Sequence, residues 1–260
     1  MWTHLKELYR FRDFLFTLAL RDIKVRYRQT LLGVAWAILQ PLAFMAIFTL
    51  IFGKFGKVSS DGSPYTLFSY TGLVPWTFFA TALSLAVGSI ASNMGLVKKI
   101  YFPREVFPIG VVLGCLVDFV IAASLVAGLM AIYHRPVTGE LVWLLWLIGL
   151  EVLFLISVSL IVSAMNVFYR DIKYIVPLIV QLGMFATPVI YSSSMVPERW
   201  RAWYMLNPMA VVIEGMRRVV LHGKSPELDS LLLATGVVIV LWVVAYTYFK
   251  RVEVKFADLI

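Results

Sequence analysis

The stretch GLVKKIYFPREVFPIG, Gly95–Gly110, lies between two long apolar runs and decides how the rest of the chain is interpreted. It carries three of the 23 lysines and arginines, two prolines and a Tyr-Phe pair. The runs on either side are long enough to cross the roughly 30 Å hydrocarbon core of a bilayer as helices. The stretch is then a short cytoplasmic turn that offers basic and aromatic side chains to something outside the membrane. From composition alone, a basic loop that only sets orientation explains it equally well.

Composition places the chain in the membrane. Hydrophobic residues make up 61% and charged residues 15% of the sequence, and the mean hydropathy is +0.86. A soluble domain is less apolar and more highly charged, so we predict an all-α polytopic membrane protein. The net charge of +8 would suit nucleic acid, but no nucleic-acid-binding motif is present, and basic loops are the usual topology signal of membrane proteins. The single cysteine, Cys115, excludes a disulfide framework and a thiolate metal cluster.

The uncharged runs predict six transmembrane helices, at about residues 31–52, 76–97, 106–133, 141–168, 174–191 and 228–249. Pro75 is expected to divide a short outer segment from the second span, because proline interrupts helices. An even number of spans places both termini on one side. The loops of that side carry 15 lysines and arginines against 8 on the other, so the positive-inside rule predicts that both termini are cytoplasmic.

Two further segments are expected not to cross the membrane. Residues 1–30 mix seven lysines and arginines with apolar residues at roughly helical spacing. This pattern predicts an amphipathic helix at the cytoplasmic interface, and a merely basic arm is the alternative. In residues 192–227, Asn207-Pro208 is a turn signal and helix start that precedes an apolar stretch too short to cross. We expect a pair of short re-entrant helices here that dip back into the outer leaflet.

Two acids, Asp118 and Glu151, fall within predicted spans. A carboxylate in a span costs roughly 2.5–3.5 kcal/mol on insertion scales and is a functional suspect by default. The two lie on adjacent predicted helices at depths that differ by only about 5 Å, and no arginine or lysine is expected at that depth. One hypothesis is a proton relay, as in a secondary transporter. The other is that each acid is neutral or hydrogen-bonded inside the helix bundle.

A stripe of aromatic and amide residues recurs every four positions down the first predicted span, at Trp36, Gln40, Phe44, Phe48 and Phe52. The spacing returns at Gln181 and Phe185 in the fifth. Aromatic faces with interspersed amides suit sugar rings, which present C–H faces and hydroxyl edges. Helix packing or lipid contact would produce the same spacing.

No site for chemistry on a nucleotide or an ester is present. The three histidines fall in separate loops, which excludes a hydrolase triad or a zinc-protease motif. Gly223-Lys224-Ser225 resembles the end of a phosphate-binding loop, but Arg218 stands where that loop needs its first glycine. Any active transport must therefore draw its energy from a partner or from an ion gradient, and the chain is not expected to be an enzyme.

Five stretches, in order along the chain, resemble the transmembrane subunits of type-2 ABC exporters. They are RDIKVRYRQTLLGVAWAILQPL (21–42), LVKKIYFPREVFP (96–108), NVFYRDIKYIVP (166–177), PVIYSSSMVPERW (188–200) and LNPMAVVIEGMRRVVLHG (206–223). Within that group the chain is most similar to the permeases that export O-antigen, capsule or wall teichoic acid, and above all to the O-antigen permeases. The resemblance covers most of the chain.

The resemblance implies a homodimer in the bacterial inner membrane, with two ATPase subunits that dock from the cytoplasm and bind ATP and Mg. The interface helix would occupy 1–30 and the ABC-2 transmembrane domain 31–260. The substrate would be a lipid-linked polysaccharide moved from cytoplasm to periplasm. The turn 96–108 would couple the ATPase to the membrane through Lys98, Lys99, Tyr101, Phe102, Pro103, Arg104 and Glu105.

The resemblance also implies roles for other residues. A cytoplasmic gate would be formed by Arg26, Arg28, Arg170 and Asp171. The stripe from Trp36 to Phe48, with Gln181 and Phe185, would line a sugar-conducting channel at the dimer axis. Glu214 and Arg217 would shape its periplasmic mouth.

Three other functions compete with this one. A proton-coupled secondary transporter that uses Asp118 and Glu151 would work from this chain alone. An ABC-2 exporter of another lipid or of a drug would share the architecture. A membrane-embedded glycosyl- or acyltransferase would need a polar catalytic cluster that the sequence lacks.

Overall fold

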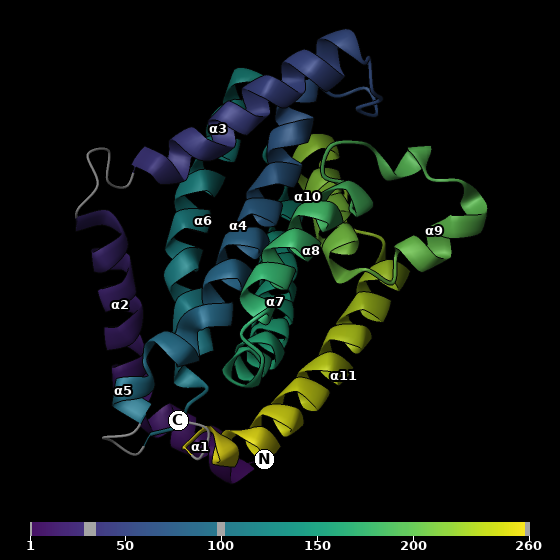
Figure 1. Ribbon diagram of the computed structural model, residues 1–260. Coiled ribbons are helices and arrows are strands. Elements are labelled where there is room, and N and C mark those ends of the chain that lie inside the picture. Colours follow the sequence, from purple (N-terminus) through teal and green to yellow (C-terminus); the bar gives the residue numbers. More distant parts are fainter. Residues whose placement is uncertain (1, 29–34, 98–101, 258–260) are drawn as a thin grey trace.

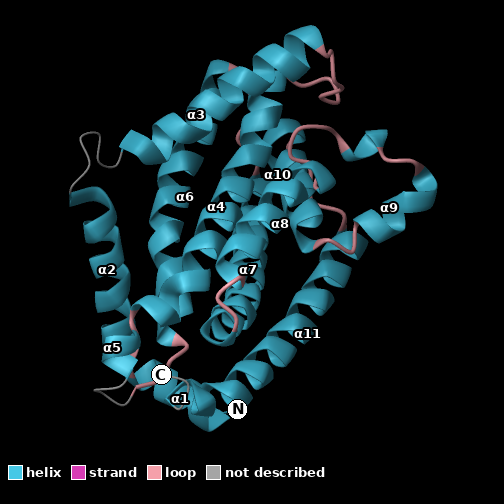
Figure 2. Cartoon of the chain, in the orientation of Figure 1, coloured by secondary structure: helices cyan, strands magenta, loops and turns pink. Residues whose placement is uncertain are grey.

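The computed structural model describes residues 2–28, 35–97 and 102–257. Within these ranges every regular element is a helix, which confirms the all-α prediction (Figures 1 and 2). The α-helices are α1 (Trp2–Arg10), α2 (Arg12–Arg28), α3 (Trp36–Phe48), α4 (Tyr65–Ser92), α5 (Met94–Val97), α6 (Val106–Ile132), α7 (Trp143–Phe168), α8 (Ile172–Ala186), α9 (Glu198–Tyr204), α10 (Pro208–His222) and α11 (Leu228–Val252). Four short pieces complete them: the π-helix η2 (Thr49–Phe55) and the 3₁₀ turns η3 (Gly139–Val142), η4 (Ser193–Met195) and η5 (Glu253–Ala257).

Five helical stretches among the described residues are long and apolar enough to cross a membrane, not six. They are Trp36–Phe55, Tyr65–Leu96, Val106–Ile132, Gly139–Phe168 and Leu228–Phe256. The remaining prediction, 174–191, corresponds to α8, which has 15 residues and is roughly 22 Å long, short of the hydrocarbon core. The helix ends because Thr187 precedes a proline and is extended, with φ −115° and ψ 147°.

Helix α4 is the centre of the bundle. Two-thirds of the most apolar 18 residues in the stretch Tyr65–Leu96 are buried. Five helices pack around α4, namely α3, α6, α7, α8 and α10 (Figure 1). The prediction that Pro75 divides this segment is wrong, because the helix runs through it from Tyr65 to Ser92. Packed membrane helices tolerate proline where the surrounding structure supports the backbone, and Pro75 is itself buried.

The N-terminal segment forms two helices that meet at Phe11, and the second runs alongside α6 (Figure 1). Gly110 and Gly114 of α6 face α2, where a Cβ on Gly114 would lie in ordinary van der Waals contact, 3.6 Å from the carbonyl oxygen of Ala19. Small residues four apart are a common device for close packing of membrane helices. The last turn of α2 therefore reaches Asp118, which lies twelve residues along α6, or about 18 Å from its start.

Helix α10 is the most completely enclosed of the short helices. Its start at Asn207-Pro208 is confirmed, since the Asn207 side chain accepts a hydrogen bond from the Met209 backbone N–H at 3.1 Å and Pro208 occupies the first turn. It ends at Gly223, whose φ of +60° suits glycine. Thus residues 192–227 do form short helices, α9 and α10, while their depth in the membrane stays a prediction.

Helix α3 lies obliquely across the ends of α4 and α6 that are remote from α1 and η5 (Figure 1). It is described from Trp36, so the start of the predicted span at 31 lies outside the described residues. Only 6% of the most apolar 18 residues of Trp36–Phe55 are buried, so this helix packs on α4 and α6 along one side and keeps much of its surface exposed in a single chain.

Candidate substrate cavity and coupling turn

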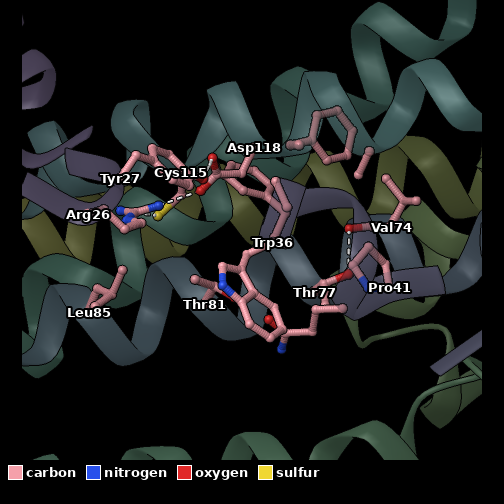
Figure 3. A pocket seen from close by; sticks show the side chains of 15 residues that line it. Arg26, Tyr27, Trp36, Pro41, Val74, Thr77, Thr81, Leu85, Cys115 and Asp118 are labelled. Carbon is pink, nitrogen blue, oxygen red and sulfur yellow. Dashed lines mark hydrogen bonds and ion pairs between the residues drawn. The ribbon is translucent and has the colours of Figure 1, made fainter. Parts of the chain in front are cut away.

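A cavity of about 390 Å³ lies where α2, α3, α4 and α6 meet (Figure 3). Its wall is mostly apolar, and its polar groups come from all four helices: Arg26, Tyr27, Gln40, Thr77, Thr81, Cys115 and Asp118. Trp36 adds an indole that is 51% exposed. An apolar wall with a few converging polar groups is the usual composition of a small-molecule site.

An ion pair closes one side of the cavity. Arg26 on α2 donates to one carboxylate oxygen of Asp118 on α6, and the Tyr27 hydroxyl donates to the other (Figure 3). Arg26 also donates to the Cys115 sulfur at 3.4 Å. The expectation that Asp118 has no arginine or lysine partner is therefore wrong. Its partner comes from the N-terminal segment, whose second helix α2 packs along α6, while the position of this segment at the membrane interface stays a prediction.

The structure divides the predicted aromatic stripe. Trp36 and Gln40 line the cavity, whereas Phe44 packs on Phe48 with a ring-centroid separation of 6.0 Å. Gln181 and Phe185 are exposed on α8 and are not among the residues that line the cavity. Their role as channel residues stays a prediction.

The described part of the coupling turn is held inside the chain. Phe102 and Pro103 are buried, and the Phe102 ring lies 5.0 Å from Phe14 of α2 and 5.3 Å from Phe107 of α6. Glu105 is fully buried. In this structure Phe102 and Glu105 face other helices of the same chain, so they set the position of the turn. Lys98, Lys99 and Tyr101 lie outside the described residues, and contact with an ATPase stays a prediction.

The four predicted gate residues lie at two levels. Arg170 and Asp171 are exposed in the turn between α7 and α8, next to Phe168, which packs on Phe256 near the C-terminus. Arg26 and Arg28 lie at the far end of α2, beside the middle of α6. The structure does not bring the two pairs together.

Arg217 on α10 is 1% exposed and holds three segments together. Its guanidinium donates to four backbone carbonyls, those of Pro188 (2.5 Å), Val189 (2.7 Å), Tyr191 (3.2 Å) and Phe68 (3.4 Å). It also lies 3.6 Å above the Phe68 ring and 3.9 Å from the Glu214 carboxylate. Burial lowers the pKa of Arg217 to about 10, so the side chain stays charged at neutral pH. Arg217 thus fixes the loop that follows α8, while the role of Glu214 and Arg217 at a periplasmic mouth stays a prediction.

Glu151 on α7 is fully buried, and neither carboxylate oxygen has a hydrogen-bond partner among the described residues. Asp118 is engaged by Arg26 and Tyr27. No hydrogen-bond chain in the described part of the structure joins the two acids, so the relay hypothesis gains no support from the geometry.

The comparison with protein families decides what kind of chain this is. Residues 14–221 match the family described as ABC-2 type transporter. The chain belongs to the ABC-2 type transporter family. It is therefore a membrane component of a transporter, and the resemblance carried by the five stretches is confirmed.

Individual relatives of this ABC-2 permease match over nearly the whole length of both chains. An O-antigen export system permease protein RfbA from Klebsiella pneumoniae is 32% identical over 250 residues, 95% of each chain. The RfbA protein from Myxococcus xanthus is 30% identical over 255 residues, 97% of each chain. The polysialic acid transport protein KpsM from Escherichia coli is 26% identical over 244 residues, 91% of this chain and 92% of its own.

The sequence did not indicate two sets of contacts in this permease. One is the pairing of Arg26 with Asp118 across 92 positions. The other joins Glu105 to Tyr246 and Lys250, near the end of α11. A weak signal for the second exists: Tyr246 and Lys250 are four residues apart, hence on one helix face, just where the last apolar run ends.

Proposed function

We propose that the chain is the channel-forming membrane subunit of an ATP-driven exporter that moves a lipid-linked, O-antigen-like polysaccharide from cytoplasm to periplasm. The observation that carries this proposal is the full-length similarity to O-antigen export system permeases. Because the sequence has no phosphate-binding loop, ATP and Mg would be bound by separate ATPase subunits. The protein would lie in the bacterial inner membrane with both termini cytoplasmic.

A homodimer with two ATPase subunits is the proposed assembly. Its support is the apolar surface that a single chain leaves uncovered on α3 and α8. On α3 the exposed residues include Trp36, Leu39, Phe44 and Ile47, and on α8 Leu178, Ile179, Leu182 and Phe185. A second copy facing these helices would enclose a path lined by aliphatic side chains and by the aromatic rings of Trp36, Phe44 and Phe185, which suit sugar rings.

The test of the proposal is co-expression with the ABC ATPase encoded nearest to the permease gene, followed by pull-down through the permease and assays of ATPase activity and glycan export. Export that needs both chains and an intact ATPase site supports the proposal. Export by the permease alone, or no stable capture of any ATPase, would reject it. A complex that hydrolyses ATP in response to a lipid or drug, and not to a lipid-linked glycan, would assign the other class of ABC-2 exporter.

Trp36→Ala is expected to slow glycan export by about 2- to 10-fold, since an aromatic contact contributes roughly 0.5–1.5 kcal/mol beyond its burial. Trp36 lines the cavity and presents an exposed ring. Trp146→Ala is the matched control, because Trp146 of α7 is also a tryptophan, is 47% exposed and does not line the cavity. Equal effects of the two changes on export per folded complex would argue that the cavity does not meet the glycan.

Glu151→Gln separates the exporter from a proton-coupled carrier. Because both Glu151 oxygens are buried without a hydrogen bond in the described structure, a neutral amide of the same shape should fit, and export is expected to stay within about twofold of wild type. A proton carrier that uses this acid would lose transport altogether. Export in the presence of a protonophore, with ATP maintained, gives an independent readout of the same difference.

A further inference from the structure

Three parts of the chain that are far apart in sequence meet at the end of the bundle that carries α1 and the C-terminus (Figure 1). They are the 102–105 turn before α6, the 169–171 turn after α7, and the C-terminal segment Lys250–Phe256, which comprises the last turn of α11 and most of η5. Their contacts are partly ionic and partly aromatic.

The ionic contacts join the 102–105 turn to α11. The Glu105 side chain is 0% exposed, and the Lys250 ammonium donates to its carboxylate at 2.8 Å. The Tyr246 hydroxyl donates to the same carboxylate at 3.3 Å. Lys250, whose side chain is 14% exposed, also lies 3.1 Å from Glu253. Because a buried carboxylate is strongly destabilised when its partner leaves, the turn and the end of α11 are held in one position relative to each other.

The aromatic contacts extend this connection to the second turn. Arg104 donates to the backbone carbonyl of Glu253, and its guanidinium lies 5.7 Å from the centre of the Phe256 ring. Phe256 is fully buried. Its ring lies 5.8 Å from that of Phe168, the last residue of α7, immediately before the 169–171 turn. A single side chain thus touches the residues that position both turns.

We propose that the C-terminal segment Lys250–Phe256 is a brace that makes the 102–105 and 169–171 turns one rigid unit, with Lys250 and Phe256 as positioning residues. A force applied to either turn is then passed to α7 and α11 together. This consequence for transport rests on the proposed function, because the force would come from the ATPase. The mechanical connection between the turns does not depend on it.

Limited proteolysis tests the connection without an ATPase. In the purified permease, Phe256→Ala is expected to speed tryptic cleavage after Arg170 or Lys173 about fivefold or more, because local opening limits cleavage at a held turn. Val254→Ala is the matched control, since Val254 lies in the same segment and is 71% exposed. Unchanged cleavage of the 169–171 turn in folded Phe256→Ala protein would overturn the proposal.

A second set of variants guards against loss of folding. Lys250→Met removes the ammonium from Glu105, and Lys250→Arg keeps a positive charge at the same place. The paired change Lys250→Met with Glu105→Gln leaves no buried charge. We expect Lys250→Met to speed cleavage at Arg104, and Lys250→Arg to restore the wild-type rate. Arg251→Met, at the exposed neighbouring position, should have no effect. If Lys250→Met and Arg251→Met are cleaved alike at Arg104, the ionic contact does not hold the turn.

In the complex with the ATPase, the same variants distinguish positioning from simple stability. Phe256→Ala is expected to assemble and hydrolyse ATP like wild type but to export about tenfold less glycan per ATP, since the contact between the C-terminal segment and the second turn is lost while every residue of the 102–105 turn stays unchanged. Wild-type export per ATP in this variant would overturn the coupling role. If wild-type permease captures no ATPase, the proposed function fails, and the proteolysis result still decides whether the brace exists.

Discussion

Replacing Arg217 by methionine is expected to prevent accumulation of the folded permease, whereas Arg218→Met should leave most of it intact. Arg217 is 1% exposed and donates to four carbonyls. Each buried acceptor left without a donor costs roughly 1–3 kcal/mol, so the loss should reach about 3–5 kcal/mol even after partial relaxation. Arg218 has a side chain that is 36% exposed and pairs with Glu227 at the surface, where an ion pair contributes at most about 1 kcal/mol.

Two quantities are measured for each variant: the amount of monodisperse permease in a detergent extract, and the midpoint temperature of its thermal unfolding. Arg217→Lys should restore little of the yield or stability, because a single ammonium nitrogen cannot replace the planar guanidinium, whose nitrogens donate to carbonyls on two sides. A change at Gly72 checks the same site from α4: a Cβ there would lie 2.6 Å from Arg217 Nη2 and 2.9 Å from the Val189 carbonyl. Gly72→Ala should therefore destabilise, and Gly88→Ala, which meets nothing within 4 Å, should not. Normal yield and midpoint for Arg217→Met would show that the loop after α8 needs no such support.

The elements that the sequence predicts well are those whose signal is local. The long apolar runs specify α6, α7 and α11, and the Asn207-Pro208 start of α10 is visible as a turn signal. The prediction of a break at Pro75 fails because it considers the helix in isolation, where proline is unfavourable. In the structure, α4 is surrounded by five other helices that support its backbone.

The contacts that the sequence does not predict are long-range. Arg26 meets Asp118 because α2 packs along α6, and nothing in either segment alone specifies that register. The Glu105 carboxylate is part of a turn that resembles a surface contact in sequence, yet the structure buries it against Lys250. Residues predicted for contact with a partner can thus be taken up by the chain's own packing, which only the tertiary arrangement reveals.

The second large effect is expected at the ion pair beside the cavity. Arg26→Met removes the positively charged partner of the Asp118 carboxylate, which lies about 18 Å from the start of α6. The side chains of Arg26 and Asp118 are 25% and 20% exposed, so the loss in free energy of unfolding should be about 2–3 kcal/mol, below the roughly 3–5 kcal/mol of a fully buried pair. Arg28→Met is the control, because Arg28 ends the same helix and is exposed.

The double change Arg26→Met with Asp118→Asn decides what the pair is for. Because it removes both charges and leaves an amide that the Tyr27 hydroxyl can still reach, stability should recover to within about 1 kcal/mol of wild type, as replacement of a whole buried ion pair usually allows. The thermal midpoints of the two single variants and the double variant form the cycle. A double variant as unstable as Arg26→Met would mean that the destabilisation does not come from an unpaired Asp118. If instead stability recovers and export stays low, the charges act on the contents of the cavity, because the protein no longer needs them to fold.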